Sequence, residues 1–189
     1  MTVVQPSQRM REIGVVQYGA PVLAEPAHPF DLPAERGDAE RAIEMLFASM
    51  ERIGQVRPFA KGMGLAAPQI GIGRAAATVQ PPGRDTAPIV LLNPRITAAS
   101  AEMDEQYEGC LSFCDVRGLV PRPLTITVKA TGLDGTTITT VYERGLARLI
   151  AHEIDHLNGL LYTARMRPGV EPIPVVEYRQ TGRAWTYDS

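Results

Sequence analysis

One stretch late in the chain carries two histidines at helical spacing, and it constrains the fold more than any other feature. His152 and His156 are four residues apart within an apolar pattern, and the whole chain has only three histidines. Residues i and i+4 of a helix lie on the same face, so both imidazoles can reach one metal ion. Glu153 is turned by about 100° from His152, where it can touch a water on that ion without binding the ion. A chance pair of histidines is the weaker interpretation, and we expect a metal-binding helix over residues 143–158.

A second helix is expected earlier, where apolar residues recur at helical spacing over residues 38–53. Asp38 can cap its start, and Gly54 can end it. Short apolar runs at 74–80 and 88–92 each stop at a proline and are typical of strands. Two stretches are predicted to be irregular: the proline-punctuated residues 12–37, which wrap the domain, and the glycine-rich residues 54–73.

The clearest strand pair lies just before the metal-binding helix. Residues 124–142 alternate between apolar residues and threonines on either side of Asp134 and Gly135, a pair typical of a β-hairpin turn. A late strand is expected at residues 175–178. The order of elements predicts one α+β domain over residues 1–189, with mainly antiparallel sheets packed around the central helix that carries the two histidines.

Composition excludes several functional classes. Net charge is −2 and charged residues make up 21%, so nothing indicates binding to nucleic acid or to an anionic membrane surface. No apolar run approaches the length of about 20 residues that a membrane span needs. The chain has two cysteines, too few for a disulfide framework, and no apolar run typical of a signal peptide near residues 1–11. We therefore expect a soluble cytoplasmic protein.

The residues alone leave the third metal ligand open. A catalytic divalent site needs a third protein ligand and an open position for water. The candidates are Cys110, Glu171, Glu177 and His28. Glu177 lies 21 residues beyond His156, an offset compatible with zinc proteases, whereas Cys110 could equally be a buried structural cysteine.

Three segments together resemble the peptide deformylase family. They are Gly62-Met63-Gly64-Leu65-Ala66-Ala67-Pro68-Gln69, Glu108-Gly109-Cys110-Leu111-Ser112 and His152-Glu153-Ile154-Asp155-His156-Leu157-Asn158-Gly159. The histidine motif alone is weakly specific, but three motifs in this order are highly specific. The resemblance extends over residues 12–166 and includes the opening residues 17–23.

The resemblance implies a metal centre and a substrate. Cys110 joins His152 and His156 as the third ligand of one ion per chain, with Fe²⁺ as the native metal and Zn²⁺ or Ni²⁺ able to replace it. A thiolate and two imidazoles are compatible with all three metals. The implied reaction removes the N-formyl group from N-formylmethionyl peptides of newly made proteins and releases formate. The ribosome exit region is an expected partner.

The resemblance also implies roles for individual residues. Metal-bound water attacks the formyl carbon, and Glu153 serves first as general base and then as general acid. Gln69, through its side-chain amide, and Leu111, through its backbone N–H, are expected to stabilise the oxyanion. Four residues are expected to bind substrate: Gly64, Met63, Gly109 and Leu149. Glu108 is expected to orient a neighbouring group and to pair with Arg117.

Some positions depart from the family pattern without touching the expected catalytic residues. Cys114 stands where many relatives carry proline, and Arg148 is polar where an apolar pocket residue is expected. The segment 54–61 is longer than in short bacterial relatives, and the tail from 166 on is rich in proline without a clear final helix. Two alternatives compete with the deformylase interpretation: a zinc endopeptidase that uses Glu177 as third ligand, and a non-catalytic protein that binds metal or formylated peptide.

Overall fold

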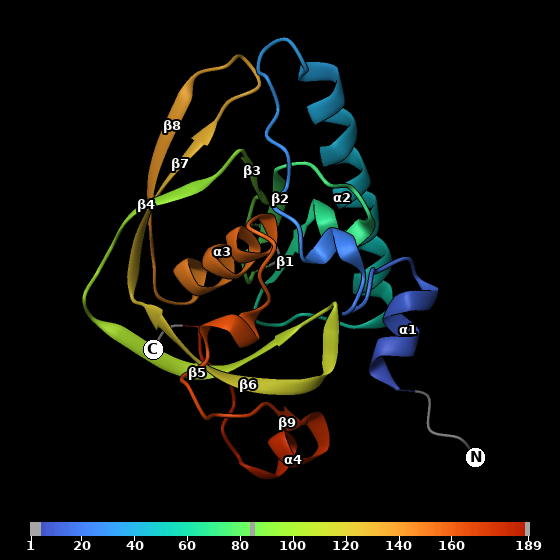
Figure 1. Ribbon diagram of the computed structural model, residues 1–189, viewed down its shortest axis with the longest axis vertical. Coiled ribbons are helices and arrows are strands. Elements are labelled where there is room, and N and C mark those ends of the chain that lie inside the picture. The colour runs from blue at the N-terminus through green and yellow to red at the C-terminus, as the bar shows by residue number, and fades with distance from the viewer. Residues whose placement is uncertain (1–4, 84–85, 188–189) are drawn as a thin grey trace.

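The computed structural model describes residues 5–83 and 86–187, and its strands form three small antiparallel sheets (Figure 1). The first sheet has the order β1 (Met63–Ala66), β2 (Ala76–Gln80), β3 (Ile89–Leu92). The second has the order β4 (Arg95–Ala99), β7 (Thr125–Thr131), β8 (Thr137–Glu143). The third has the order β5 (Met103–Cys110), β6 (Phe113–Pro123), β9 (Ile173–Pro174).

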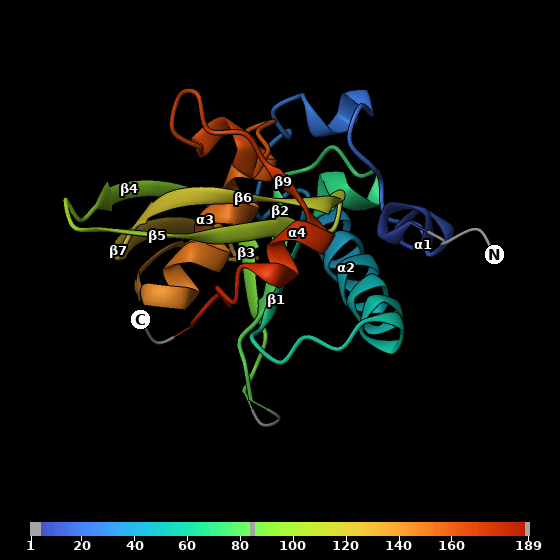
Figure 2. The ribbon, with the colours of Figure 1, turned by 90° about the horizontal axis from the view of Figure 1, so that it is seen from below.

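Helix α3 (Arg144–Leu157) lies at the centre, with strands of all three sheets around it (Figures 1 and 2). Its apolar side chains, such as Ile150 and Ile154, belong to one core cluster with Val79 of β2 and Ile126 of β7. A helix that is buried nearly all round is held by tertiary packing more than by its own propensity. The expected α+β fold around this helix is confirmed, and its predicted limits of 143–158 are correct to within one residue.

Helix α2 (Arg36–Val56) packs on the first sheet from the outer side (Figure 2). Leu46 and Ile53 are fully buried in a cluster with Leu65 of β1. The predicted limits of this helix were wrong at both ends, because Asp38 lies in its first turn and Gly54 lies inside it. The helix ends where Arg57 turns to extended backbone, as expected for a residue that precedes a proline.

Two further sequence predictions were wrong. The glycine-rich stretch 54–73 contains strand β1 and the short 3₁₀ helix η2 (Ala67–Ile70), and both are buried against the core. Residues 175–178 form part of helix α4 (Val175–Gln180), not a strand. Pro174 caps that helix, and its fixed φ favours a helix start over the strand preference of the two valines.

The remaining elements are short and lie at the edges. Helix α1 (Pro6–Glu12), which the sequence pattern did not indicate, starts the described chain. Two 3₁₀ helices complete the fold: η1 (Pro21–Leu23) and η3 (Tyr162–Arg165). The β7–β8 hairpin forms as predicted, with Gly135 at a positive φ of 84° in its turn. Within the described residues, no helix has the length and apolar character that a membrane crossing requires.

The end of α3 gives a stability prediction. Gly159 follows the helix at φ 72°, and a Cβ there would lie 2.9 Å from the backbone of Ala24. Gly169 has a similar φ of 79°, but a Cβ there would meet nothing within 4 Å. Both alanine substitutions carry the strain of positive φ. Gly159→Ala in addition pushes the chain away from the backbone of Ala24, and this second effect costs about 1–3 kcal/mol of folding free energy. We expect chemical denaturation to show a lower free energy of unfolding for Gly159→Ala than for Gly169→Ala, and equal losses would contradict this packing argument.

Candidate active site

Cys110, His152 and His156 come together in the interior, although the cysteine and the nearer histidine are 42 positions apart in the sequence. One candidate ligand atom from each residue lies within 4.8 Å of the others. Sγ of Cys110 lies 3.1 Å from Nε2 of His156. All three side chains are buried, so the sulfur and both rings face one another away from bulk water.

The local structure explains this meeting. Cys110 is the last residue of β5, just before the tight turn that leads into β6, and the β5–β6 hairpin packs beside α3 (Figure 1). His152 and His156 lie one turn apart on the same face of α3. The hairpin therefore presents the thiol to the face of the helix that carries both imidazoles.

Glu108 links the hairpin to the helix through a buried network. Its Oε2 accepts a hydrogen bond from Nδ1 of His152 at 3.0 Å. Arg122 donates to both carboxylate oxygens, at 2.9 and 3.0 Å, and Arg148 donates to Oε1 at 2.7 Å. Burial raises the pKa of Glu108, but the charge of Arg122 and the bond from His152 outweigh it and hold the pKa far below its usual range. Glu108 is thus ionised and fixes the ring of His152.

The same network corrects one expectation and explains another. Arg117 does not pair with Glu108; its Nη1 donates to the carbonyls of Cys114 and Val116. Arg148 stands where an apolar side chain was expected because it is one of the two guanidinium partners of Glu108. A buried carboxylate without such partners would be costly.

Asp155, between the two histidines of α3, anchors the other side of the helix. Its Oδ2 accepts from Nη1 of Arg122 at 2.6 Å, and its Oδ1 accepts from Nη2 of Arg165 at 2.6 Å. Arg122 therefore bridges Glu108 and Asp155, and one guanidinium ties β6 to β5 and to α3.

Glu153 is a buried carboxyl at the edge of the cluster. Burial raises its pKa to about 7, although the charges of His152 and His156 act in the opposite direction. Its Oε2 has no hydrogen-bond partner among the described residues. A Cβ on Gly64 would lie 2.1 Å from Oε1, so only glycine leaves room for this carboxyl. A group with a pKa near neutrality can both accept and release a proton.

Gln69 points its side-chain amide at the cluster. Its Nε2 lies 3.5 Å from Sγ of Cys110 and 3.3 Å from Oγ of Ser112, while its Oε1 accepts from the backbone N–H of Ala66. The hydrogen bond to Ala66 therefore fixes the side chain of Gln69 while its amide nitrogen faces Cys110. Leu111 is buried in the hairpin turn beside Cys110, where its carbonyl accepts from Nε2 of Gln17.

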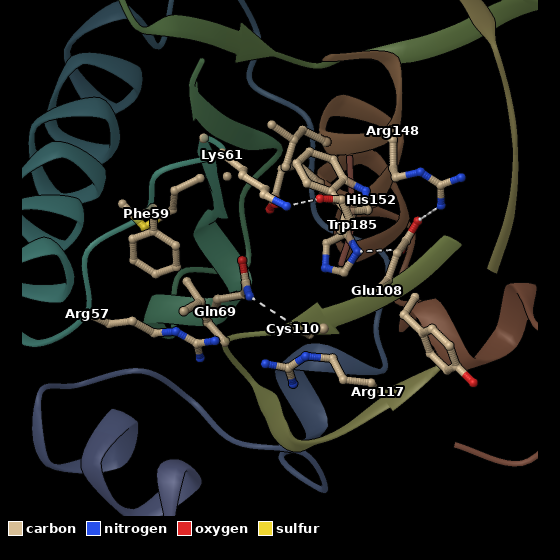
Figure 3. A pocket seen from close by; sticks show the side chains of 18 of the residues that line it. Arg57, Phe59, Lys61, Gln69, Glu108, Cys110, Arg117, Arg148, His152 and Trp185 are labelled. Carbon is tan, nitrogen blue, oxygen red and sulfur yellow. Dashed lines mark hydrogen bonds and ion pairs between the residues drawn. The ribbon is translucent and has the colours of Figure 1, made fainter. Parts of the chain in front are cut away.

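A cavity of about 210 Å³ opens onto the cluster (Figure 3). The four residues expected to bind substrate all line it: Gly64, Met63, Gly109 and Leu149. Sequence reasoning did not assign several other lining residues to the site: Arg57, Phe59, Lys61, Tyr107, Tyr178 and Trp185. The length of segment 54–61 was the only signal for Arg57, Phe59 and Lys61, and the unusual tail was the only signal for Tyr178 and Trp185. No signal in the sequence pointed to Tyr107. Nζ of Lys61 donates to the carbonyl of Trp185, so these two segments meet above the cavity.

The other candidate third ligands lie elsewhere. Glu177 is exposed on α4, and Glu171 and His28 are also exposed. In the described part of the chain, Cys110, His152 and His156 form the one group whose ligand atoms converge.

The cluster fits a divalent metal on the chemistry of its donors. Nδ1 of His152 is occupied by Glu108, which leaves Nε2 for a metal, an arrangement typical of metal-binding histidines. Burial raises the pKa of the Cys110 thiol, but the charge of His156 and hydrogen bonds from both histidines outweigh it and hold the pKa well below its usual value. A thiolate with two imidazoles suits iron, zinc or nickel.

Comparison with known proteins identifies similar chains. The family model described as polypeptide deformylase matches residues 13–171. The peptide deformylase of Desulforudis audaxviator is 36% identical over 151 residues, which cover 80% of this chain and 91% of the relative. That of Halalkalibacterium halodurans is 37% identical over 167 residues, which cover 84% and 92%. The Met-Ala-Ser-bound crystal structure of class I type b peptide deformylase from Acinetobacter baumannii matches with a TM-score of 0.68 and 33% identity, over 88% of this chain and all of that one.

The Glu108 network yields a prediction about metal binding. Glu108→Gln keeps the size of the side chain but removes the charge that fixes His152, and loss of such a partner typically weakens metal affinity about 10–100-fold. Glu105→Gln is the matched control, because Glu105 lies on the same strand and, among the residues that the structure describes, its one ion-pair partner is the exposed Arg167. Competition with a chelator measures both affinities. A Glu108→Gln affinity equal to that of Glu105→Gln would show that the network does not orient the ligand.

Proposed function

Because the chain belongs to the polypeptide deformylase family, we propose that it hydrolyses the formyl amide at the N-terminus of N-formylmethionyl peptides. The observation that carries the proposal is the convergence of Cys110, His152 and His156 on one buried point, with the free carboxyl of Glu153 beside it. The products are formate and a peptide with a free amino terminus.

Cys110, His152 and His156 would hold a divalent cation, which would act as a Lewis acid and bring the pKa of a water molecule at the site toward neutrality. In the proposed mechanism, Glu153 accepts a proton from the attacking water and then delivers it to the departing amine. Burial, which raises the pKa of Glu153 above that of an ordinary carboxyl, favours both transfers. Glu108 keeps the ring of His152 in one tautomer throughout.

Two donors are proposed for the negative charge that develops on the formyl oxygen. Nε2 of Gln69 already faces Cys110, and the backbone N–H of Leu111 follows Cys110 directly. Donors that are fixed before the reaction stabilise the transition state without reorganisation, and each typically contributes about 2.7–4 kcal/mol. The hydrogen bond to Ala66 holds the amide of Gln69 in the required orientation.

Substrate is proposed to lie along the cavity. Met63 and Leu149 supply apolar surface for the methionine side chain. Gly64 and Gly109 leave backbone open to an extended peptide. The similar deformylase of Acinetobacter baumannii was solved with Met-Ala-Ser bound, which supports a short peptide as the ligand.

The proposed native ion is Fe²⁺, with Zn²⁺ or Ni²⁺ able to replace it, one per chain. Both cysteines are free thiols, as the thiolate ligand requires. The proposed place of action is the cytoplasm, where peptide synthesis supplies formylated N-termini and thiols stay reduced. Contact with the ribosome exit region stays a prediction.

The third ligand can be tested by comparing Cys110→Ala with Glu177→Ala. We expect Cys110→Ala to lose the metal, because two imidazoles alone hold it poorly, and Glu177→Ala to keep it. Metal analysis after anaerobic purification gives the answer, with circular dichroism as the control for folding. The reverse pattern would favour a zinc endopeptidase of the kind that uses a downstream glutamate.

The role of Glu153 can be tested with formyl-Met-Ala-Ser. Glu153→Gln is expected to keep the metal and to release formate about 10²–10⁴-fold more slowly, the usual contribution of a general acid–base group. Formate release by the iron-loaded wild type and variant is the measurement. Equal rates, or no release by the wild type, would reject the enzyme hypothesis in favour of a binding protein.

A further inference from the structure

Two guanidinium groups face the substrate cavity without an acidic partner. Arg57 and Arg117 both line it and point toward one another beside Cys110 (Figure 3). Within the described residues, neither lies within 4.0 Å of a carboxylate oxygen. The other arginine of the cavity, Arg148, is fully engaged with Glu108 and Asp104.

Arg117 is held rigidly and is nearly fully buried, with only 8% of its surface exposed. Its Nη1 is used by the carbonyls of Cys114 and Val116, while Nε and Nη2 make no hydrogen bond to any described residue. Its guanidinium lies against the backbone of Gly109, where a Cβ would be 2.5 Å from Cζ. It is therefore a fixed charge with free donors, and it lies against Gly109, the residue that precedes the candidate metal ligand Cys110.

Arg57 adds a second charge from another part of the chain. It follows α2 directly, and its backbone N–H bonds to Ile53 while its side chain lies over the ring of Phe59. Burial lowers the pKa of Arg117, and the charge of Arg57 lowers it further, which places the two guanidiniums within electrostatic range. Like charges repel, and an anion between the two guanidiniums would relieve that repulsion.

The acids of the cavity do not neutralise this pair. Glu108 is saturated by Arg122, Arg148 and His152, and the carboxyl of Glu153 lies against Gly64. A guanidinium pair with free N–H groups matches the geometry of a carboxylate.

We propose that Arg57 and Arg117 form a subsite for a carboxylate of the peptide substrate, supplied by an aspartate or glutamate side chain shortly after the N-terminal methionine. The proposal rests on the proposed function, because it assumes that the formyl group lies at Cys110 and that the peptide runs outward from it. An extended peptide advances about 3.3 Å per residue, so side chains of its second to fourth residues can reach Arg117 beside Gly109.

The test uses full-length, metal-loaded protein and peptides of the form formyl-Met-Ala-Ala-Ala-amide. One alanine at the second, third or fourth position is replaced by Glu or, in the matched peptide, by Gln. The C-terminal amide ensures that the Glu side chain is the only carboxylate. The free-acid form of the parent peptide shows separately whether a terminal carboxylate serves as well. The ratio of kcat/KM for Glu over Gln is read within one protein sample, so it is independent of metal content.

We expect a ratio of about three- to tenfold at one of these positions, the size of a partly exposed ion pair. The ratio should shrink at high salt, because salt screens such pairs. Arg57→Gln and Arg117→Gln should bring it close to one, and Arg57→Glu should reverse it. Arg52→Gln is the matched control: it removes the same charge from α2, but Arg52 bonds Ser49 and does not line the cavity.

The proposal would be overturned if the wild type gave a Glu-over-Gln ratio of kcat/KM near one at all three positions. It would also be overturned if Arg57→Gln kept the same ratio as the wild type. Failure of the proposed function looks different, because then no formylated peptide is turned over. In that case, calorimetric binding of Met-Ala-Glu-amide against Met-Ala-Gln-amide tests the subsite alone. Tighter binding of the acidic peptide, lost in Arg57→Gln, supports the subsite, and equal binding rejects it.

Discussion

The buried carboxylate of Glu108 is the interaction on which the site depends. It receives hydrogen bonds from Arg122 of β6 and from Arg148 and His152 of α3, so strand and helix are joined through one ionised group. Buried charges are tolerated when they are fully paired and are costly when one partner is missing. The pairing therefore fixes both the packing of the hairpin on α3 and the orientation of a metal-facing ring.

Sequence patterns predicted the parts of the molecule that depend on local periodicity. The i, i+4 spacing of His152 and His156 placed both rings on one helix face, and the Asp134–Gly135 turn located the β7–β8 hairpin. The third member of the cluster was different, because no spacing links Cys110 to a helix that begins 34 residues later. Only the family resemblance favoured it over Glu177, and the convergence in space supports it.

The parts that were missed are those set by tertiary contacts. Residues 175–178 have strand-like composition, yet Pro174 starts a helix there. The family resemblance favoured Arg117 as the partner of Glu108, but Arg122 reaches that carboxylate across the β5–β6 pair instead. The cationic side chains around the cavity come from segments outside the recognisable motifs, and their convergence is visible only in three dimensions.

Glu108 and Cys110 both lie on strand β5. The anchoring of α3 by Glu108 and the placement of the Cys110 thiol therefore both depend on how β5 pairs with β6. Slippage of β5 against β6 by one residue would turn inward side chains outward. Sγ of Cys110 and the carboxylate of Glu108 would then both point away from α3. The helix would lose its buried ion pair with Glu108, and the cluster of Cys110, His152 and His156 would be lost at the same time.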